Sequence, residues 1–212
     1  MNAEQTIGLV EETFRPSEVR KPIVHALEGA YAAAFGAAPE YGPWLAARWG
    51  VPHHRRALVN GELSRVAVEI PNAKVVLINT IQRSYTYLGL QIGQVLALPA
   101  RTEAPNTLPR RADIRCKLAE SPQMSLPGLE FFGIEPKSDL LMVVIGHGPS
   151  EDPSSLGWAR VLIPDRFYLR PIHSIDLVAS EINQDNHPEN VSASRPVPIR
   201  LRENLLTDEI AQ

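Results

Sequence analysis

The sequence predicts an α+β fold, in which a small N-terminal helical unit packs on a mainly antiparallel β-sheet or half-barrel. Apolar residues recur at helical spacing before about residue 62 and alternate as in strands after it. The chain also contains 19 prolines, which interrupt helix interiors and sheet ladders and so favour short elements. Between the later strands we expect no helix long enough for a parallel crossover, which favours antiparallel pairing.

Three segments of different composition follow from this change in pattern. We assign residues 1–62 to the helical unit, residues 63–180 to the β-rich core and residues 181–212 to a polar C-terminal extension. The total of 212 residues is typical of one domain, or of one domain with a small appendage.

Four helices are expected in the first segment, because apolar residues recur every three or four positions there and Gly or Pro interrupts the pattern. The second helix starts from an N-cap at Ser17, and the fourth ends at the pair Asn60 and Gly61. The predicted helices span Glu4–Phe14, Glu18–Phe35 with Gly36 as its stop, Trp44–Trp49 and His53–Val59.

The second segment contains apolar runs that predict six or seven strands. The first two, Arg65–Ile70 and Lys74–Asn79, are predicted to form a hairpin, and a bulge at Gly93 is predicted to interrupt the third. The fragment Ala112–Leu118 fits either a strand or the start of a helix. The remaining predicted strands are Tyr85–Gln91 continuing into Gln94–Leu98, Leu140–Ile145, Trp158–Ile163 and, at an edge because of Pro171, Phe167–Val178.

The composition limits which cellular compartment and which partners we expect for the protein. No apolar run approaches the ~20 residues that span a bilayer, and the N-terminal residues lack a basic region followed by an apolar core. The single cysteine, Cys116, excludes an intramolecular disulfide. We therefore expect a cytoplasmic protein with no membrane partner, and the abundance of Ala, Arg and Pro suggests a bacterial one.

The charge is unevenly distributed along the chain, although its net value is only −3. Residues 15–117 contain 14 Lys and Arg against 7 Asp and Glu, a net charge of +7, and the remaining residues carry −10. Such an asymmetry bears on partners rather than on fold. It predicts a nucleic acid or an acidic protein as the partner of the basic part.

The segment Leu45–Glu62 resembles the helix-turn-helix of bacterial repressors. Ala46, Gly50 and Val51 match the small residue and the tight turn, although the segment from Gly50 to Asn60 is one residue short and Arg56 stands at an apolar position. The resemblance implies base contacts in the major groove and phosphate contacts beside them. The base-contacting candidates are His53, His54, Arg55 and Arg56, and the phosphate-contacting candidates are Arg48 and Arg65. The alternative is a helical cap on the sheet whose basic residues are solvated.

A second basic cluster lies in the loop and the element that follow it, from Arg101 to Lys117. Arginine suits phosphate or carboxylate recognition because its guanidinium is a planar, permanently charged fork. The cluster's nucleic-acid-binding candidates are Arg110, Arg111 and Arg115. The alternative is a solvated edge strand that charge protects from pairing with other chains.

His147 lies between two glycines, in a stretch that we predict to be a loop. Histidine can act as an acid or a base near neutral pH, so His147 with Asp165 and His173 is the candidate catalytic set. Two histidines and a carboxylate would also suit Zn or Fe, although the spacing matches no metal motif and the cofactor is left open. The alternatives are a turn residue at His147 and an ordinary strand residue at His173, and a buried, inert thiol at Cys116.

Two functions follow from these candidates. The first is an intracellular binding or regulatory protein that contacts nucleic acid or an acidic protein through its basic part. The second is a metal-dependent or acid–base hydrolase that uses His147 with Asp165 or His173. The sequence does not decide whether the chain is an enzyme.

Overall fold

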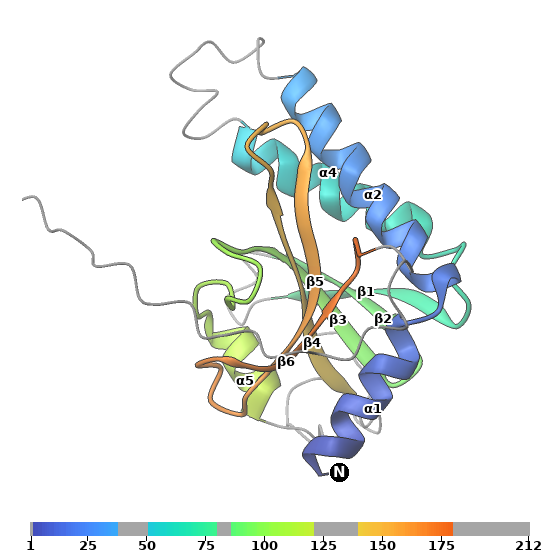
Figure 1. Cartoon of the computed structure of the whole chain (residues 1–212), viewed down its shortest axis with the longest axis vertical. Helices are drawn as coiled ribbons and strands as arrows, with labels where there is room; N and C mark the ends of the chain where they lie inside the picture. Colours follow the sequence, from blue (N-terminus) through green and yellow to red (C-terminus); the bar gives the residue numbers. More distant parts are fainter. Residues whose placement is uncertain (1, 38–50, 80–85, 121–139, 180–212) are drawn as a thin grey trace, which may run out of the picture. The chain divides into compact units, whose positions relative to one another are not determined.

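The computed structural model describes residues 2–37, 51–79, 86–120 and 140–179, which fold as an α+β structure (Figure 1). The helices are α1 (Ala3–Phe14), α2 (Ser17–Gly36), α4 (Val51–Val66) and α5 (Asp113–Glu120). The strands are β1 (Ala73–Asn79), β2 (Thr86–Ile92), β3 (Val95–Arg101), β4 (Leu141–Pro149), β5 (Leu156–Pro164) and β6 (Pro171–Asp176). In this part of the chain, no helix is long and apolar enough to cross a membrane.

The six strands form one open sheet in the order β1-β2-β3-β4-β5-β6. Every neighbouring pair is antiparallel except β3 and β4, which run parallel and align Arg101 with His147 at their carboxyl ends. The predicted α+β class with a mainly antiparallel sheet is therefore confirmed. The parallel pair was not expected, because parallel neighbours need a crossover connection, which usually contains a helix. In the described part of the connection from β3 to β4, the helix is the short α5.

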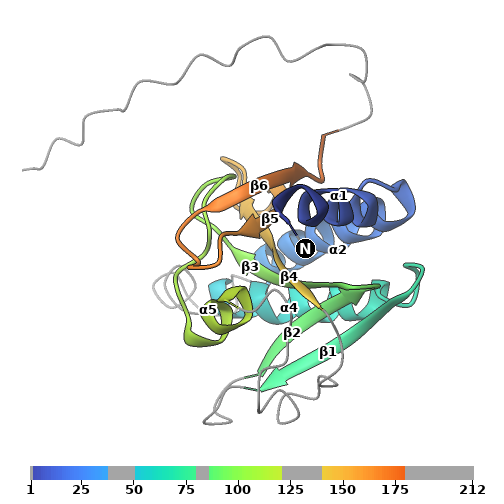
Figure 2. The same ribbon diagram turned by 90° about the horizontal axis from the view of Figure 1, so that it is seen from below.

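The sheet has a hydrophobic core on each face, and successive residues of β3 contribute to opposite cores. Val95 and Ala97 belong to the core that α1, α2 and α4 share with the sheet, whereas Leu96 and Leu98 belong to the core that includes Leu118 of α5. Figure 2 shows α2 and α4 on one side of the strands and α5 on the other. The central strands β3 and β4 are thus buried on both faces over most of their length.

The first two helices lie where the sequence predicted them, with one difference at a cap. A reciprocal capping box between Asn2 and Gln5 begins α1, since each side chain accepts a hydrogen bond from the other residue's backbone N–H. The N-cap of α2 is Pro16 and makes no side-chain cap, so Ser17 is the first helical residue rather than the cap. Pro22 lies inside the helix, beyond its first turn, and has no N–H to donate to the carbonyl of Glu18.

The helix α4 is longer than predicted, and this overturns the first predicted strand. It runs through Gly61 to Val66 because Val59, Leu63 and Val66 continue one buried stripe against α2. The segment Arg65–Ile70 is therefore the end of a helix and a turn, and the predicted hairpin does not form. The strand β1 pairs with β2 instead. The predicted helix Trp44–Trp49 lies outside the described residues.

The chain reverses at Gly93, where a bulge was predicted. Ile92 pairs with Val95, so β2 and β3 form a hairpin rather than one interrupted strand. The fragment that fitted either a strand or a helix is helical, as α5. The predicted loop around His147 is also wrong, because these residues belong to β4 and pair with β5. The last predicted strand does lie at an edge, as β6, but it begins only at Pro171 rather than at Phe167.

Gly93 occupies the left-handed region with φ of 55°. We expect Gly93→Ala to lower the free energy of unfolding by about 1–2 kcal/mol, because a Cβ disfavours this conformation. Urea unfolding followed by circular dichroism measures the change. Gly61→Ala in the interior of α4, where no atom would contact the new Cβ, is the control and should gain about 0.5–1 kcal/mol. Equal unfolding midpoints for the two variants would contradict the expectation.

Candidate functional site: an arginine pocket

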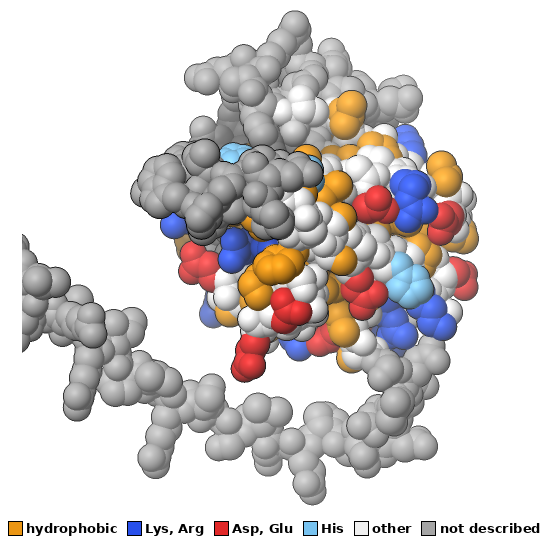
Figure 3. Space-filling view, turned by 90° about the horizontal axis from the view of Figure 1, so that it is seen from above, with side chains coloured by type: hydrophobic (Ala, Val, Ile, Leu, Met, Phe, Trp, Pro, Cys, Tyr) orange, Lys and Arg blue, Asp and Glu red, His pale blue; other side chains and the backbone are white. Residues whose placement is uncertain are grey.

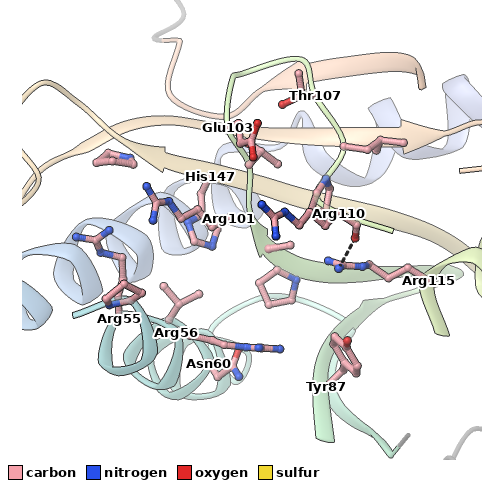
Figure 4. Close-up of a pocket in the computed structure, with 18 of the residues that line it drawn as sticks. Arg55, Arg56, Asn60, Tyr87, Arg101, Glu103, Thr107, Arg110, Arg115 and His147 are labelled. Carbon is pink, nitrogen blue, oxygen red and sulfur yellow. Dashed lines mark hydrogen bonds between the residues drawn. The ribbon is translucent and has the colours of Figure 1, made fainter. Parts of the chain in front are cut away.

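A pocket of about 930 Å³ opens where β3 and β4 end together (Figure 4). Because these two strands are parallel, Arg101 and His147 lie side by side at their carboxyl ends. The first turns of α4 form one wall, and the segment that follows β3 forms another. The carboxyl ends of parallel strands are a common location for ligand sites in open sheets.

Five arginines from separate segments line this pocket, and we call it the arginine pocket. Two come from α4, one from the end of β3, and two from the segment that leads into α5 and from α5 itself. They are Arg55, Arg56, Arg101, Arg110 and Arg115. Glu103 is the one carboxylate among the described residues that line it. The two basic clusters of the sequence therefore meet at one place.

One face of the molecule does not share this bias. On the face drawn in Figure 3, acidic and basic side chains are interspersed with apolar ones over the described residues. Outside the pocket, some arginines are paired with carboxylates, such as Arg15 with Glu11 and Arg65 with Glu62. The arginine pocket thus differs in its charge from the face drawn in Figure 3.

His147 lines the inner wall of the arginine pocket, and the fully buried Tyr31 lies behind it. The Tyr31 hydroxyl lies 2.9 Å from Nδ1 of His147, and the rings meet edge to face with centroids 5.7 Å apart. Burial, and then the charges of Arg55 and Arg101, lower the pKa of His147 to about 3. Burial raises the pKa of Tyr31 to about 12. Both groups are therefore neutral near pH 7.

Arg55 is held deep in the same wall and is only 5% exposed. It donates a hydrogen bond of 2.9 Å to the carbonyl of Pro153, and its guanidinium carbon lies 4.4 Å from the centroid of the Tyr31 ring. Burial lowers its pKa. Its Nε is buried without a hydrogen-bond partner in the described part of the chain. A buried charge with an unused donor has a high desolvation cost, which a bound anion would offset.

Aromatic rings lie among the outer arginines. The guanidinium carbons of Arg56 and Arg115 lie 5.6 and 6.0 Å from the centroid of Tyr87. Arg115 also donates to the carbonyl of Arg110 at 2.6 Å. Burial lowers the pKa of Arg56, and the charge of Arg115 adds to this effect. Cation–π contacts reduce the cost of placing these like charges together.

Trp158 completes the wall beside His147. Its Nε1 donates to Oγ1 of Thr102 at 3.1 Å, and its ring covers Gly148 so closely that no side chain would fit there. The backbone N–H of Thr102 in turn donates to the carbonyl of His147 at 3.0 Å. These bonds join the end of β3 to β4 and β5 and fix the floor of the pocket.

Comparison with known proteins adds no family to this geometry. Protein-family models, curated sequences and solved structures gave no match. The functional argument therefore rests on the residues themselves.

The nucleic-acid-binding candidates divide into two groups. Five of them line the arginine pocket, namely His53, Arg55, Arg56, Arg110 and Arg115. The others that the structure describes lie outside its lining: Arg65 bridges Glu62 and Glu69, Arg111 donates to the carbonyl of Phe167 at 3.3 Å, and His54 is partly exposed on α4. Arg48 lies outside the described residues.

The helix-turn-helix resemblance does not extend to the end of the second helix. Asn60 and Gly61 were expected to end it, but α4 continues to Val66. Arg55, a candidate for base contacts, is buried against Tyr31 and Pro153 rather than directed outward. What the structure shows of α4 is a helix that packs on α2 and lines a pocket with its first turns.

The three catalytic candidates do not converge. His147 aligns with Ala159 of β5 and His173 with Ile163, four residues farther along, which corresponds to about 13 Å. His173 contacts Glu11 of α1 at 3.1 Å. The carboxylate of Asp165 accepts from the N–H of Leu169 at 2.6 Å. Within the described ranges, no three His, Cys, Asp or Glu side chains could hold a metal ion.

Several pocket residues were not identified from the sequence. Arg101 was part of a basic cluster but was not named as a binding residue, and Tyr87 and Trp158 were assigned only to strands. Tyr31, which supports His147 from behind the lining, was assigned only to a helix. The signal for Arg101 was present, since it begins the second basic cluster. The aromatic residues gave no signal of their own, because their role depends on which strands are neighbours.

Proposed function

We propose that the protein binds nucleic acid and holds its phosphate groups in the arginine pocket. The observation that carries this proposal is the convergence of five arginines in one concave site whose described lining includes a single carboxylate. Guanidinium groups bind phosphate oxygens in a bidentate manner and keep their charge at any physiological pH. Gathering like charges costs free energy, and a polyanion in the site offsets this cost.

The aromatic residues favour nucleic acid over an acidic protein as the partner. Tyr87 and Trp158 line the same pocket as the arginines. Bases stack on aromatic rings and on guanidinium planes, and this contact is tolerant of sequence. Acidic side chains offer no flat surface for such stacking. The pocket is also concave, which suits an unpaired strand better than the cylinder of a duplex.

Fluorescence anisotropy with labelled single-stranded and duplex oligonucleotides tests this function over a series of salt concentrations. We expect single-stranded binding whose affinity falls with salt, because each phosphate contact releases counterions. The double variant Arg101→Ala, Arg110→Ala should bind about tenfold or more weakly and lower the slope of log K against log salt by about 1–2. Both side chains are exposed, so the fold should tolerate their truncation.

Arg15→Ala is the matched control, because Arg15 is an exposed arginine that pairs with Glu11 outside the pocket. It should bind as the unaltered protein does. Absence of binding at low salt, or an equal loss in Arg15→Ala, would overturn the proposal. Tighter binding of polyglutamate than of the oligonucleotide would instead assign the pocket to an acidic protein.

A further inference from the structure

The arginine pocket has two ends of different character, which Figure 4 separates clearly. Arg55, Arg101 and His147 lie together at the inner end. At the outer end, Arg56 and Arg115 lie near the ring of Tyr87. Two of the three inner side chains are buried, since His147 is 4% exposed and Arg55 is 5% exposed, whereas Arg101 is exposed at the entrance to this end. The outer end is more open.

The hydrogen bond behind His147 sets which ring nitrogen carries the proton. Tyr31 is fully buried, and within the described residues its hydroxyl contacts no acceptor other than Nδ1 of His147. The hydroxyl therefore donates to Nδ1, because otherwise its own proton would be buried without a partner. The imidazole is then left with its proton on Nε2. His147 is a pocket-lining residue that serves as a neutral donor.

The inner end thus offers donors to a ligand. Arg55 and Arg101 supply guanidinium groups, and Nε of Arg55 is buried without a partner in the described part of the chain. His147 adds a neutral N–H. Thr102 and Trp158 already bond to each other and close the side. Such a set suits a group that only accepts hydrogen bonds and carries concentrated negative charge.

We propose that the inner end of the arginine pocket binds a terminal phosphate, carried by a nucleotide or by the end of a single strand. A phosphate monoester has three free oxygens and close to two negative charges near pH 7, whereas a phosphodiester within a strand has two free oxygens and one charge. An internal phosphodiester also needs room for the chain on both sides, which a buried end of a pocket does not give. This inference rests on the proposed nucleic-acid function and names its preferred ligand.

Three labelled single-stranded oligonucleotides of one sequence test the inference, with a 5′-phosphate, with a 3′-phosphate and with neither. We expect one phosphorylated strand to bind at least about tenfold more tightly than the unphosphorylated strand, a ratio that corresponds to 1.4 kcal/mol. His147→Asn should collapse this ratio, because the amide takes the place of Nδ1 and leaves nothing at Nε2. Tyr31→Phe is the second variant and should reduce the ratio while keeping the ring.

The ratio of the affinities for the phosphorylated and unphosphorylated strands distinguishes a lost contact from a lost fold. Partial unfolding of a variant would weaken the binding of both strands equally and leave the ratio unchanged. Arg110→Ala removes a side chain from the residue whose carbonyl accepts from Arg115 of the outer end, and it should weaken both strands and leave the ratio unchanged. A nucleoside monophosphate added as competitor distinguishes the two sources. If it displaces the phosphorylated strand at similar concentration, the ligand is a free nucleotide, and if it does not, the ligand is a strand end; either result is consistent with the inference.

Two outcomes would overturn the inference and leave the proposed function standing. One is equal affinity for all three strands, and the other is a ratio that survives in both His147→Asn and Tyr31→Phe. If no strand binds at low salt, the proposed function fails together with the inference.

Discussion

Gly148→Ala is expected to lower the free energy of unfolding by about 2 kcal/mol, within the range that overpacking costs. A Cβ built on Gly148 would overlap ring carbons of Trp158, which cover the glycine. The indole is rigid and cannot yield by a small rotation, so the whole ring must move away from β4. That movement would also break the hydrogen bond from Nε1 of Trp158 to Thr102.

The same substitution should weaken nucleic-acid binding, because Trp158 is a wall of the arginine pocket. Urea unfolding measures the stability, and anisotropy of the unphosphorylated strand under native conditions measures the binding. Gly29→Ala is the control, since nothing in α2 or around it would contact the new Cβ. It should stabilise the protein by about 0.5–1 kcal/mol, because Ala favours a helix interior. An unfolding midpoint for Gly148→Ala at or above that of the unaltered protein would refute the expectation.

The glycines around His147 also show why one part of the site was misjudged from sequence. A histidine between two glycines is typical of a loop, where glycine supplies conformational freedom. In the structure Gly146 and Gly148 lie within β4, and their role is to leave space: a Cβ at Gly146 would lie 2.9 Å from a methyl of Leu162. Close packing with β5 is a tertiary requirement, and the local sequence does not distinguish it from flexibility.

The fold class could be predicted because it depends on local periodicity, whereas the ends of α4 and the start of the sheet could not. Residues Arg65–Ile70 alternate as a strand does, but Leu63 and Val66 face α2 and hold the end of α4 in helical form. Ion pairs from Arg65 to Glu62 and Glu69, at helical spacing, support the same conformation. Contacts between helices therefore outweighed a short alternating pattern.

The two basic clusters were visible in the sequence, but their meeting was not. It depends on the parallel pairing of β3 with β4, which places Arg101 beside His147 and directs the following segment past α4. Pairing of that kind joins residues more than forty positions apart, and no spacing within either cluster encodes it. The arginines were thus predictable as candidates, and the pocket was not.

The buried His147 predicts a specific acid sensitivity of the fold. Its pKa is lowered to about 3 in the folded protein, whereas an unfolded chain has a histidine pKa near 6.5. Between these two pKa values, His147 is therefore protonated in the unfolded state and neutral in the folded state. The stability that neutral His147 retains is fully present above about pH 6.5 and is lost as the pH falls toward 3, with a limiting slope of about 1.4 kcal/mol per pH unit.

Three groups from three elements act on this histidine, and each has a stated effect. The charges of Arg55 on α4 and Arg101 on β3 repel the imidazolium, and Tyr31 on α2 donates to the neutral ring. Burial is the largest of the causes. Protonation of His147 in the folded state would thus place a third positive charge near two guanidinium groups. The proton is therefore taken up when the chain unfolds.

Urea unfolding at a series of pH values tests this sensitivity against His147→Asn, whose amide can still accept from Tyr31. From about pH 7.5 to about pH 4.5 the unaltered protein should lose roughly 2.5 kcal/mol more stability than the variant. The other titrating groups are common to both proteins and cancel in the difference. Parallel curves for the two proteins would show that His147 takes up its proton in the folded state, which would contradict the buried, neutral imidazole on which the inner end of the pocket is built.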